Sequence, residues 1–184
     1  MLIGHSIDVM PLMLAIKRRP ELWKEDTYLR DYPQGKDVES IILRFMSKSG
    51  HEAEDELKNP LSLFDQYESI DYPPYAKLPE ARSIVMFLMA QVGGERLGRV
   101  MVNKIRPGGR IYPHVDMPAQ TDYYSRFHVV LQSAPGVDFR AGDEHVYMGV
   151  GEAWWFNNAQ EHQVINNSGV DRIHMICDVR TSTK

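Results

Sequence analysis

Hydrophobic side chains in the first 95 residues recur mainly at the spacing of helices. The repeat from Val9 to Ile16 is followed by the basic run Lys17-Arg-Arg19 and predicts a first helix, because cations are favoured at a helix C-terminus. Residues 38–46 are a second candidate, since their large apolar side chains fall on one side of a helix.

A stronger helical pattern starts at Pro79 and is closed by Gly93-Gly94. An apolar stripe runs between these ends and predicts that one face of this helix is buried. Between the helical segments, residues 50–60 are acidic and polar and are expected to be exposed. Residues 65–77 contain several tyrosines and a Pro-Pro pair, which predict an irregular loop.

Near Gly98 the pattern changes to short segments in which apolar and polar residues alternate, separated by turn residues. Such alternation is typical of half-buried strands. We predict strands at 98–105, 110–116, 124–132, 136–140, 144–149, 153–157, 161–166 and 170–179. Eight short strands joined by turns favour a closed or double-sheet architecture, with a jelly roll as the leading choice.

The predicted fold class is therefore α+β, mainly β, with a double-stranded β-helix, a cupin-like jelly roll, as its core. A chain of 184 residues fits one domain. Within residues 1–184 we expect 1–95 to supply helical and loop support that buttresses one sheet, and 96–184 to form the jelly-roll catalytic core.

The composition is that of an ordinary globular protein, with 43% hydrophobic and 25% charged residues, which argues against global disorder. The formal net charge is -4 and no long basic block is present, so binding to nucleic acid through bulk charge is not expected. The N-terminal apolar run is interrupted by Asp8 and Pro11, and its charges follow it. This pattern is neither a signal peptide nor a membrane span, and no membrane partner is expected.

The only cysteine is Cys177, which excludes an intrachain disulfide framework and a cysteine-rich zinc site. A single thiol suits a reducing compartment, so we expect a cytoplasmic protein.

The candidate chemistry lies in His114, Asp116 and His162, followed ten residues later by Arg172. His114 and Asp116 are two residues apart on a predicted strand and therefore point to the same face. Two imidazoles and one carboxylate can occupy one face of an Fe(II) octahedron and leave three positions for a chelating co-substrate and O2. An arginine can hold a distal carboxylate of that co-substrate by a bidentate ion pair.

Two later strands each have one mixed face and one apolar face. Arg126, His128 and Val130 share a face, and Arg172, His174, Ile176 and Asp178 share another. The opposite faces are purely apolar, so the period alone leaves open which face is buried. If the barrel interior holds an ionic co-substrate, the mixed faces point inward and the apolar faces pack under the helices.

Residues 100–180 resemble the aspartyl/asparaginyl β-hydroxylase family of Fe(II)- and 2-oxoglutarate-dependent oxygenases. The motifs that carry the resemblance are Ile105-Arg-Pro-Gly-Gly-Arg-Ile-Tyr-Pro-His114, Arg126-Phe-His128, Gly151-Glu-Ala-Trp-Trp-Phe156, Glu161-His162 and Arg172-Ile-His-Met-Ile-Cys-Asp178. The combination is specific, although each motif is short.

The resemblance implies that His114 and His162 ligate iron and that Arg172 binds the C5 carboxylate of 2-oxoglutarate. It further implies that His128 lies beside this co-substrate, with Asn103 near the distal carboxylate. Candidates for contact with the substrate, or for support of the site, are Arg126, His174 and Trp155. His174 shares a face with Arg172 and could orient it, whereas Trp155 and its aromatic neighbours also suit a packed strand.

Asp116 is a departure from part of this family, since the animal peptide hydroxylases have glycine at that position. The segment Met117 to Ser125 is also longer than in those relatives and could line the substrate entrance. The resemblance implies an amino acid substrate, either free or within a peptide or protein, which Arg126, Arg106 or Arg110 could meet. The expected reaction consumes O2 and 2-oxoglutarate and yields succinate and CO2.

Two other classes of function remain open at this point. A cupin-like metalloenzyme that does not use 2-oxoglutarate would need the histidines but not Arg172. In a non-catalytic jelly-roll binding module, the polar faces would be ordinary surface. The fold alone does not choose among the three classes.

Overall fold

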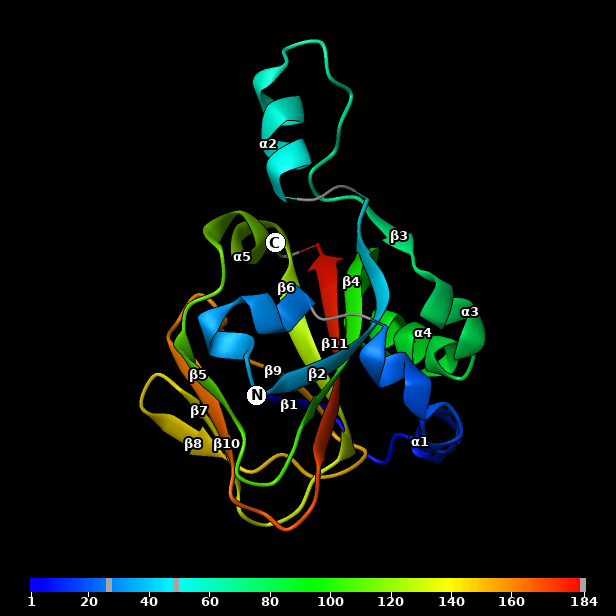
Figure 1. The fold of residues 1–184 in the computed structure, drawn as a ribbon, viewed down its shortest axis with the longest axis vertical. Helices are drawn as coiled ribbons and strands as arrows, with labels where there is room; N and C mark the ends of the chain where they lie inside the picture. Colours follow the sequence, from blue (N-terminus) through cyan, green and yellow to red (C-terminus); the bar gives the residue numbers. More distant parts are fainter. Residues whose placement is uncertain (26–27, 48–49, 183–184) are drawn as a thin grey trace.

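The computed structural model describes residues 1–25, 28–47 and 50–182 (Figure 1). Its helices are α1 (Met10–Lys17), α2 (Gly50–Lys58), α3 (Pro73–Lys77), α4 (Ala81–Gln91) and α5 (Pro118–Tyr123), with short 3-10 turns η1 (Pro20–Lys24), η2 (Tyr28–Asp31) and η3 (Pro33–Gly35). Its strands are β1 (Leu2–Gly4), β2 (Val38–Met46), β3 (Ser69–Asp71), β4 (Gly94–Ile105), β5 (Arg110–His114), β6 (Ser125–Gln132), β7 (Val137–Ala141), β8 (Glu144–Val146), β9 (Ala153–Trp155), β10 (His162–Asn166) and β11 (Arg172–Thr181).

Within the described residues these strands form two antiparallel sheets. The larger has seven strands in the order β1-β9-β6-β11-β4-β2-β3, and the smaller has four in the order β5-β10-β7-β8. The chain from β4 to β11 passes repeatedly between the sheets, so strands adjacent in sequence mostly lie in different sheets. The eight-stranded jelly roll predicted from the alternation is confirmed, with β1, β2 and β3 extending the larger sheet at its two edges.

The apolar face of the larger sheet packs under the helices, on the side away from the smaller sheet (Figure 1). Phe127, Val129, Met175 and Cys177 are buried there against residues of α1, α3 and α4. The mixed faces of β6 and β11 point instead between the two sheets. The strand period therefore gives the two sides of this sheet different chemistry, and the interior of the barrel receives the polar groups.

Residues 38–46 form strand β2, so the prediction of a helix there is wrong. This segment pairs with β4 from Val38 opposite Ile105 to Arg44 opposite Val100. Both of its faces are largely buried, since the helices cover one face and the barrel interior lies against the other. A continuous apolar run of this kind fits either period, and the long-range pairing with β4 decides for the strand.

One further segment differs from the sequence-based expectation. Residues 65–77 contain strand β3, which pairs with β2, and helix α3, so they are not simply an irregular loop. Residues 117–125 include the short helix α5, which starts with Pro118 in the first turn. The predicted helix after Pro79 is confirmed as α4, and the first predicted helix is confirmed as α1.

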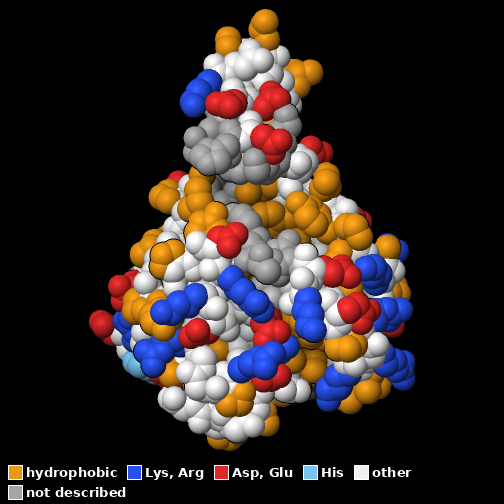
Figure 2. Space-filling view, in the orientation of Figure 1, with side chains coloured by type: hydrophobic (Ala, Val, Ile, Leu, Met, Phe, Trp, Pro, Cys, Tyr) orange, Lys and Arg blue, Asp and Glu red, His pale blue; other side chains and the backbone are white. Residues whose placement is uncertain are grey.

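Helix α2 and the chain that follows it project from the rest of the molecule as an arm (Figure 1). Its outer part exposes Leu61 and Leu63, and Figure 2 shows hydrophobic side chains at the outer end of the arm and around its base. Among the residues that the structure describes, no helix has both the length and the apolar character needed to cross a bilayer.

Candidate active site

His114, Asp116 and His162 meet at one end of the barrel. His114 ends β5 and His162 begins β10, and the two residues are register partners in the smaller sheet. Their rings lie 4.2 Å apart between centroids. Oδ1 of Asp116 is 3.5 Å from Nε2 of His114 and 4.0 Å from Nε2 of His162. One potential ligand atom from each residue lies within 4.8 Å of the others, so the three side chains can grip one metal ion.

Both histidines present the same ring nitrogen to the centre of this group. Nδ1 of His114 is 2.8 Å from the carbonyl oxygen of Tyr112, and Nδ1 of His162 is 3.0 Å from that of Gln160. A carbonyl oxygen only accepts hydrogen bonds, so each Nδ1 carries the hydrogen and each Nε2 keeps a lone pair. Burial lowers the pKa of His162 to about 4, which keeps that ring neutral at pH 7. This is the arrangement that metal-ligating histidines adopt.

Asp116 is held so that only one of its oxygens faces the histidines. Its Oδ2 accepts hydrogen bonds from Nη1 of Arg126 and from Nδ2 of Asn158, both at 2.7 Å. Burial would raise the pKa of this carboxyl, but the charge of Arg126 and the hydrogen bond from Asn158 hold it well below its usual range. Asp116 is therefore an ionised carboxylate with Oδ1 free for a metal.

Arg126 is in turn fixed by the buried carboxylate of Asp178. Nε and Nη2 of Arg126 donate to Oδ1 and Oδ2 of Asp178 at 2.8 Å and 3.1 Å. Nε of Arg99 donates to Oδ2 of the same carboxylate at 2.7 Å. Burial opposes the ionised form of Asp178, yet the two arginines lower its pKa below the ordinary value. The network links β4, β6 and β11 to the carboxylate of Asp116.

A cavity of about 290 Å³ opens beside these residues. His114, Asp116, His162, Arg126, His128 and Asn103 all line it, so the structure brings together six of the side chains predicted from the sequence. Phe139 and Phe156 also line it and lie edge-on to the ring of His128. Asn103 accepts a hydrogen bond from Ser40 at 3.0 Å, which orients its amide.

Arg172 and His174 lie deeper in the barrel than the metal-binding group. Arg172 is completely buried, and its Nη2 lies 2.9 Å from Nδ1 of His174, which is 3.4 Å from Nδ1 of His128. Nε and Nη1 of Arg172 have no hydrogen-bond partner among the described residues. Burial lowers the pKa of Arg172 to about 9 and those of His128 and His174 well below their usual value. Arg172 is thus a buried cation with no anionic partner in the part of the chain that the structure describes.

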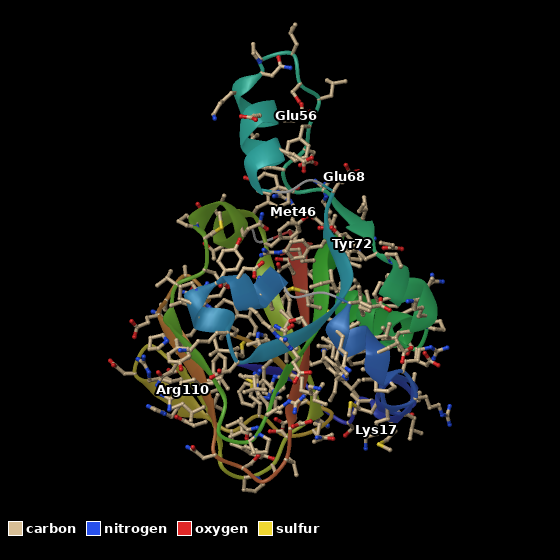
Figure 3. The ribbon with its side chains drawn as sticks, viewed as in Figure 1. Lys17, Met46, Glu56, Glu68, Tyr72 and Arg110 are labelled. Atoms are coloured by element: carbon tan, nitrogen blue, oxygen red, sulfur yellow. The ribbon has the colours of Figure 1, made fainter. Side chains whose placement is uncertain are left out.

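The other predicted candidates lie elsewhere. Trp155 pairs with Phe127 and packs on the helix side of the larger sheet, apart from the cavity. Arg106 is an exposed residue paired with Glu39. Figure 3 shows Arg110 low on β5, at the end of the barrel opposite Met46 and Tyr72. Sequence reasoning missed Asn158 and Arg99 as members of the site, because neither stands in a motif with the residues it contacts.

Comparison with known proteins decides the family. The sequence profile described as Aspartyl/Asparaginyl beta-hydroxylase matches residues 46–182, well over half of the chain. The chain belongs to this family. It is accordingly a hydroxylase of the class that uses Fe(II), 2-oxoglutarate and O2, and the resemblance seen in the motifs of the β core is confirmed. No curated protein sequence matches it significantly.

Solved structures share the fold of this hydroxylase at low sequence identity. A 2OG-Fe(II) oxygenase family oxidoreductase from Burkholderia pseudomallei is 14% identical with a TM-score of 0.54, and the match covers 90% of this chain and 77% of that one. A prolyl-4-hydroxylase from Pseudomonas putida is 13% identical with a TM-score of 0.50, and the match covers 98% of this chain and 91% of that one. Both likenesses concern the fold alone.

The side chains present fit the cofactor and co-substrate of this hydroxylase class. Two imidazole nitrogens and one carboxylate oxygen are a donor set that suits Fe(II). Arg172 is a buried guanidinium with two unpartnered nitrogens, and a carboxylate supplies the charge and the hydrogen-bond acceptors that it lacks among the described residues.

Proposed function

We propose that this protein hydroxylates an amino acid, free or within a peptide or protein, and converts 2-oxoglutarate and O2 to succinate and CO2. The observation that carries the proposal is a pairing of two sites in one barrel. One end presents three metal-binding side chains, and the interior holds a buried arginine with two unpartnered nitrogens. A cupin-like enzyme that does not use 2-oxoglutarate has no need for the second site.

In this proposal His114, Asp116 and His162 hold Fe(II) through Nε2, Oδ1 and Nε2. The bound iron, with 2-oxoglutarate and O2, supplies the oxidising power that inserts one oxygen atom into a C–H bond of the substrate. Arg172 binds the distal carboxylate of 2-oxoglutarate, with His174 fixing the guanidinium. His128 and Asn103 line the cavity beside the metal-binding side chains.

The remaining residues position these groups and exclude water. Arg126 and Asn158 occupy Oδ2 of Asp116, so this carboxylate offers one oxygen to the metal. The ring of Phe156 lies 4.9 Å from that of His162 between centroids, and Phe139 packs beside it. These rings form an apolar wall next to the ligands, which limits the access of water to the reacting groups.

The experiment is a succinate-release assay over free amino acids and peptides, with mass analysis for one added oxygen atom. Asp116→Ala and His162→Ala should abolish substrate-dependent succinate formation and weaken binding of Fe(II). His145→Ala is the matched control, because His145 is exposed and paired with Asp138 away from the cavity. Undiminished turnover in the Asp116 or His162 variant would refute the assignment of the ligands.

A further inference from the structure

The two arginines that line the cavity differ in how many of their guanidinium nitrogens donate hydrogen bonds to other described residues. Arg126 uses all three of its nitrogens, with Nη1 on Asp116 and with Nε and Nη2 on Asp178. Its side chain is therefore committed to holding the metal-binding carboxylate. A substrate carboxylate could reach Arg126 only by displacing one of these buried ion pairs, which is costly.

Arg99 is the second arginine on the cavity wall, and only one of its nitrogens is occupied. Its Nε donates to Asp178, while its Nη1 and Nη2 make no hydrogen bond in the structure as described. The side chain is 15% exposed and Asp178 is 2% exposed, so a buried anchor fixes a guanidinium whose outer edge faces the cavity. A guanidinium held by Nε presents two parallel N–H groups to a carboxylate.

The charges around Arg99 also leave room for an anion. Arg99 and Arg126 share the single carboxylate of Asp178, so this group of three carries one uncompensated positive charge. Asp116 also contacts Arg126, but its Oδ1 faces the two histidines, and its charge is used by the metal that they hold in the proposed function. Arg172 lies apart, where the distal carboxylate of 2-oxoglutarate is expected.

The surface beside Arg99 is apolar. Phe45, Met101 and Ile176 form a buried cluster that lines the same cavity, and the guanidinium of Arg99 lies 5.7 Å from the ring centroid of Phe45. A ligand held by Arg99 would place its remaining atoms against these side chains. The site thus offers one cationic anchor and an apolar wall.

We propose that Arg99 binds a carboxylate of the substrate, and that the substrate is a small acid whose remainder is apolar. The inference rests on the proposed function for its charge count and names the substrate class of that same site. The carboxylate can belong to a free amino acid or to the C-terminus of a peptide, because the recognition is the same in both cases.

The test compares binding of acids with that of their uncharged amides. Isothermal titration measures the binding of L-leucine, L-methionine and L-phenylalanine, of their primary amides, and of the corresponding glycyl dipeptides. The protein is used both without metal and loaded with Fe(II) and 2-oxoglutarate under nitrogen. The dipeptides show whether a peptide C-terminus serves as well as a free amino acid.

We expect at least one acid to bind the wild-type protein more tightly than its amide. Arg99→Gln should weaken binding of that acid by about tenfold to a hundredfold, the loss that follows when a charged hydrogen-bond donor is removed. It should leave the affinity for 2-oxoglutarate unchanged. Asp178 keeps two hydrogen bonds from Arg126 in this variant, so the fold should persist. Arg106→Gln is the matched control, since Arg106 is exposed and away from the cavity wall.

Three outcomes overturn the inference: equal binding of acids and amides, an unchanged preference in Arg99→Gln, or no binding of any acid. The result also separates this inference from the proposed function. Acid binding that depends on Arg99, without succinate formation, would contradict the proposed reaction and leave the assignment of Arg99 intact. Succinate formation with a substrate whose binding does not depend on Arg99 would support the proposed reaction and contradict the assignment of Arg99.

Discussion

Replacement of Arg172 by methionine should stabilise the protein when no ligand is bound. Arg172 is completely buried and has no anionic partner among the described residues. The fall of its pKa to about 9, because of burial, corresponds to roughly 5 kcal/mol of unfavourable free energy for the charged form. Since the folded pKa lies below the unfolded one, this penalty is fully present below pH 9 and is relieved only as the pH rises further.

The net gain is smaller than the penalty itself. Methionine leaves Nδ1 of His174 without the contact that Arg172 gives it, which costs about 1 to 3 kcal/mol. We therefore expect Arg172→Met to raise the free energy of unfolding by about 2 to 4 kcal/mol, within the range seen when buried charges are replaced by apolar groups. Each kcal/mol corresponds to roughly 2 to 4 °C in Tm for a domain of this size.

The assay is thermal unfolding followed by circular dichroism at pH 7, with metal and 2-oxoglutarate removed and then restored under nitrogen. In the proposed function the co-substrate carboxylate pairs with Arg172, so restored ligand should raise the Tm of the wild-type protein and should have much less effect on Arg172→Met. Ile105→Met is the control, since Ile105 is the register partner of Arg172 and is equally buried. A lower Tm for Arg172→Met than for the wild type, both without ligand, would refute this account of the buried charge.

Two other substitutions test the network behind the metal ligands. Asn158→Ala should weaken metal binding by about tenfold to a hundredfold, because Oδ2 of Asp116 loses one of its two donors; titration with Co(II) followed by visible absorption measures this, and an unchanged affinity would contradict it. Asp178→Asn should lower the free energy of unfolding by about 3 to 5 kcal/mol at pH 7, since it leaves Arg126 and Arg99 without their shared anion. The pKa of Asp178 is lowered in the folded state, so its contribution is present above about pH 4 and is lost as the pH falls further. Urea unfolding should show that the free energies of unfolding of the wild type and of Asp178→Asn converge at acid pH. A difference that is the same at neutral and at acid pH would contradict this account.

The β core could be predicted from the sequence because its strands carry their own signals. Each strand from β4 to β11 overlaps a predicted segment, since alternating residues and turn residues mark half-buried strands locally. The same alternation placed His114 and Asp116 on one face. Their meeting with His162 depends on pairing of β5 with β10, which the order and spacing of the motifs indicated but did not fix.

The parts that could not be predicted depend on contacts distant in sequence. The large apolar side chains of β2 also fall on one side of a helix, which is why the sequence predicts a helix there. Only the pairing of β2 with β4, some 60 residues away, distinguishes the two periods. Arg99 and Asp178 each occupy the polar side of an alternating strand, which is a usable signal. Their pairing across 79 residues has no mark in the sequence.

The thiol of Cys177 lies outside the cavity in which the oxidising chemistry is expected. Its side chain lies under the helices, on the face of β11 opposite to Ile176 and Asp178, and burial raises the pKa of its thiol. A protonated thiol behind a sheet is a poor target for oxidants. Met101 lines the cavity instead. Met117 lines the same cavity and is exposed. Stray oxidation during unproductive cycles should therefore appear first as a sulfoxide at Met117 or Met101, and the lone cysteine should outlast the activity of the enzyme.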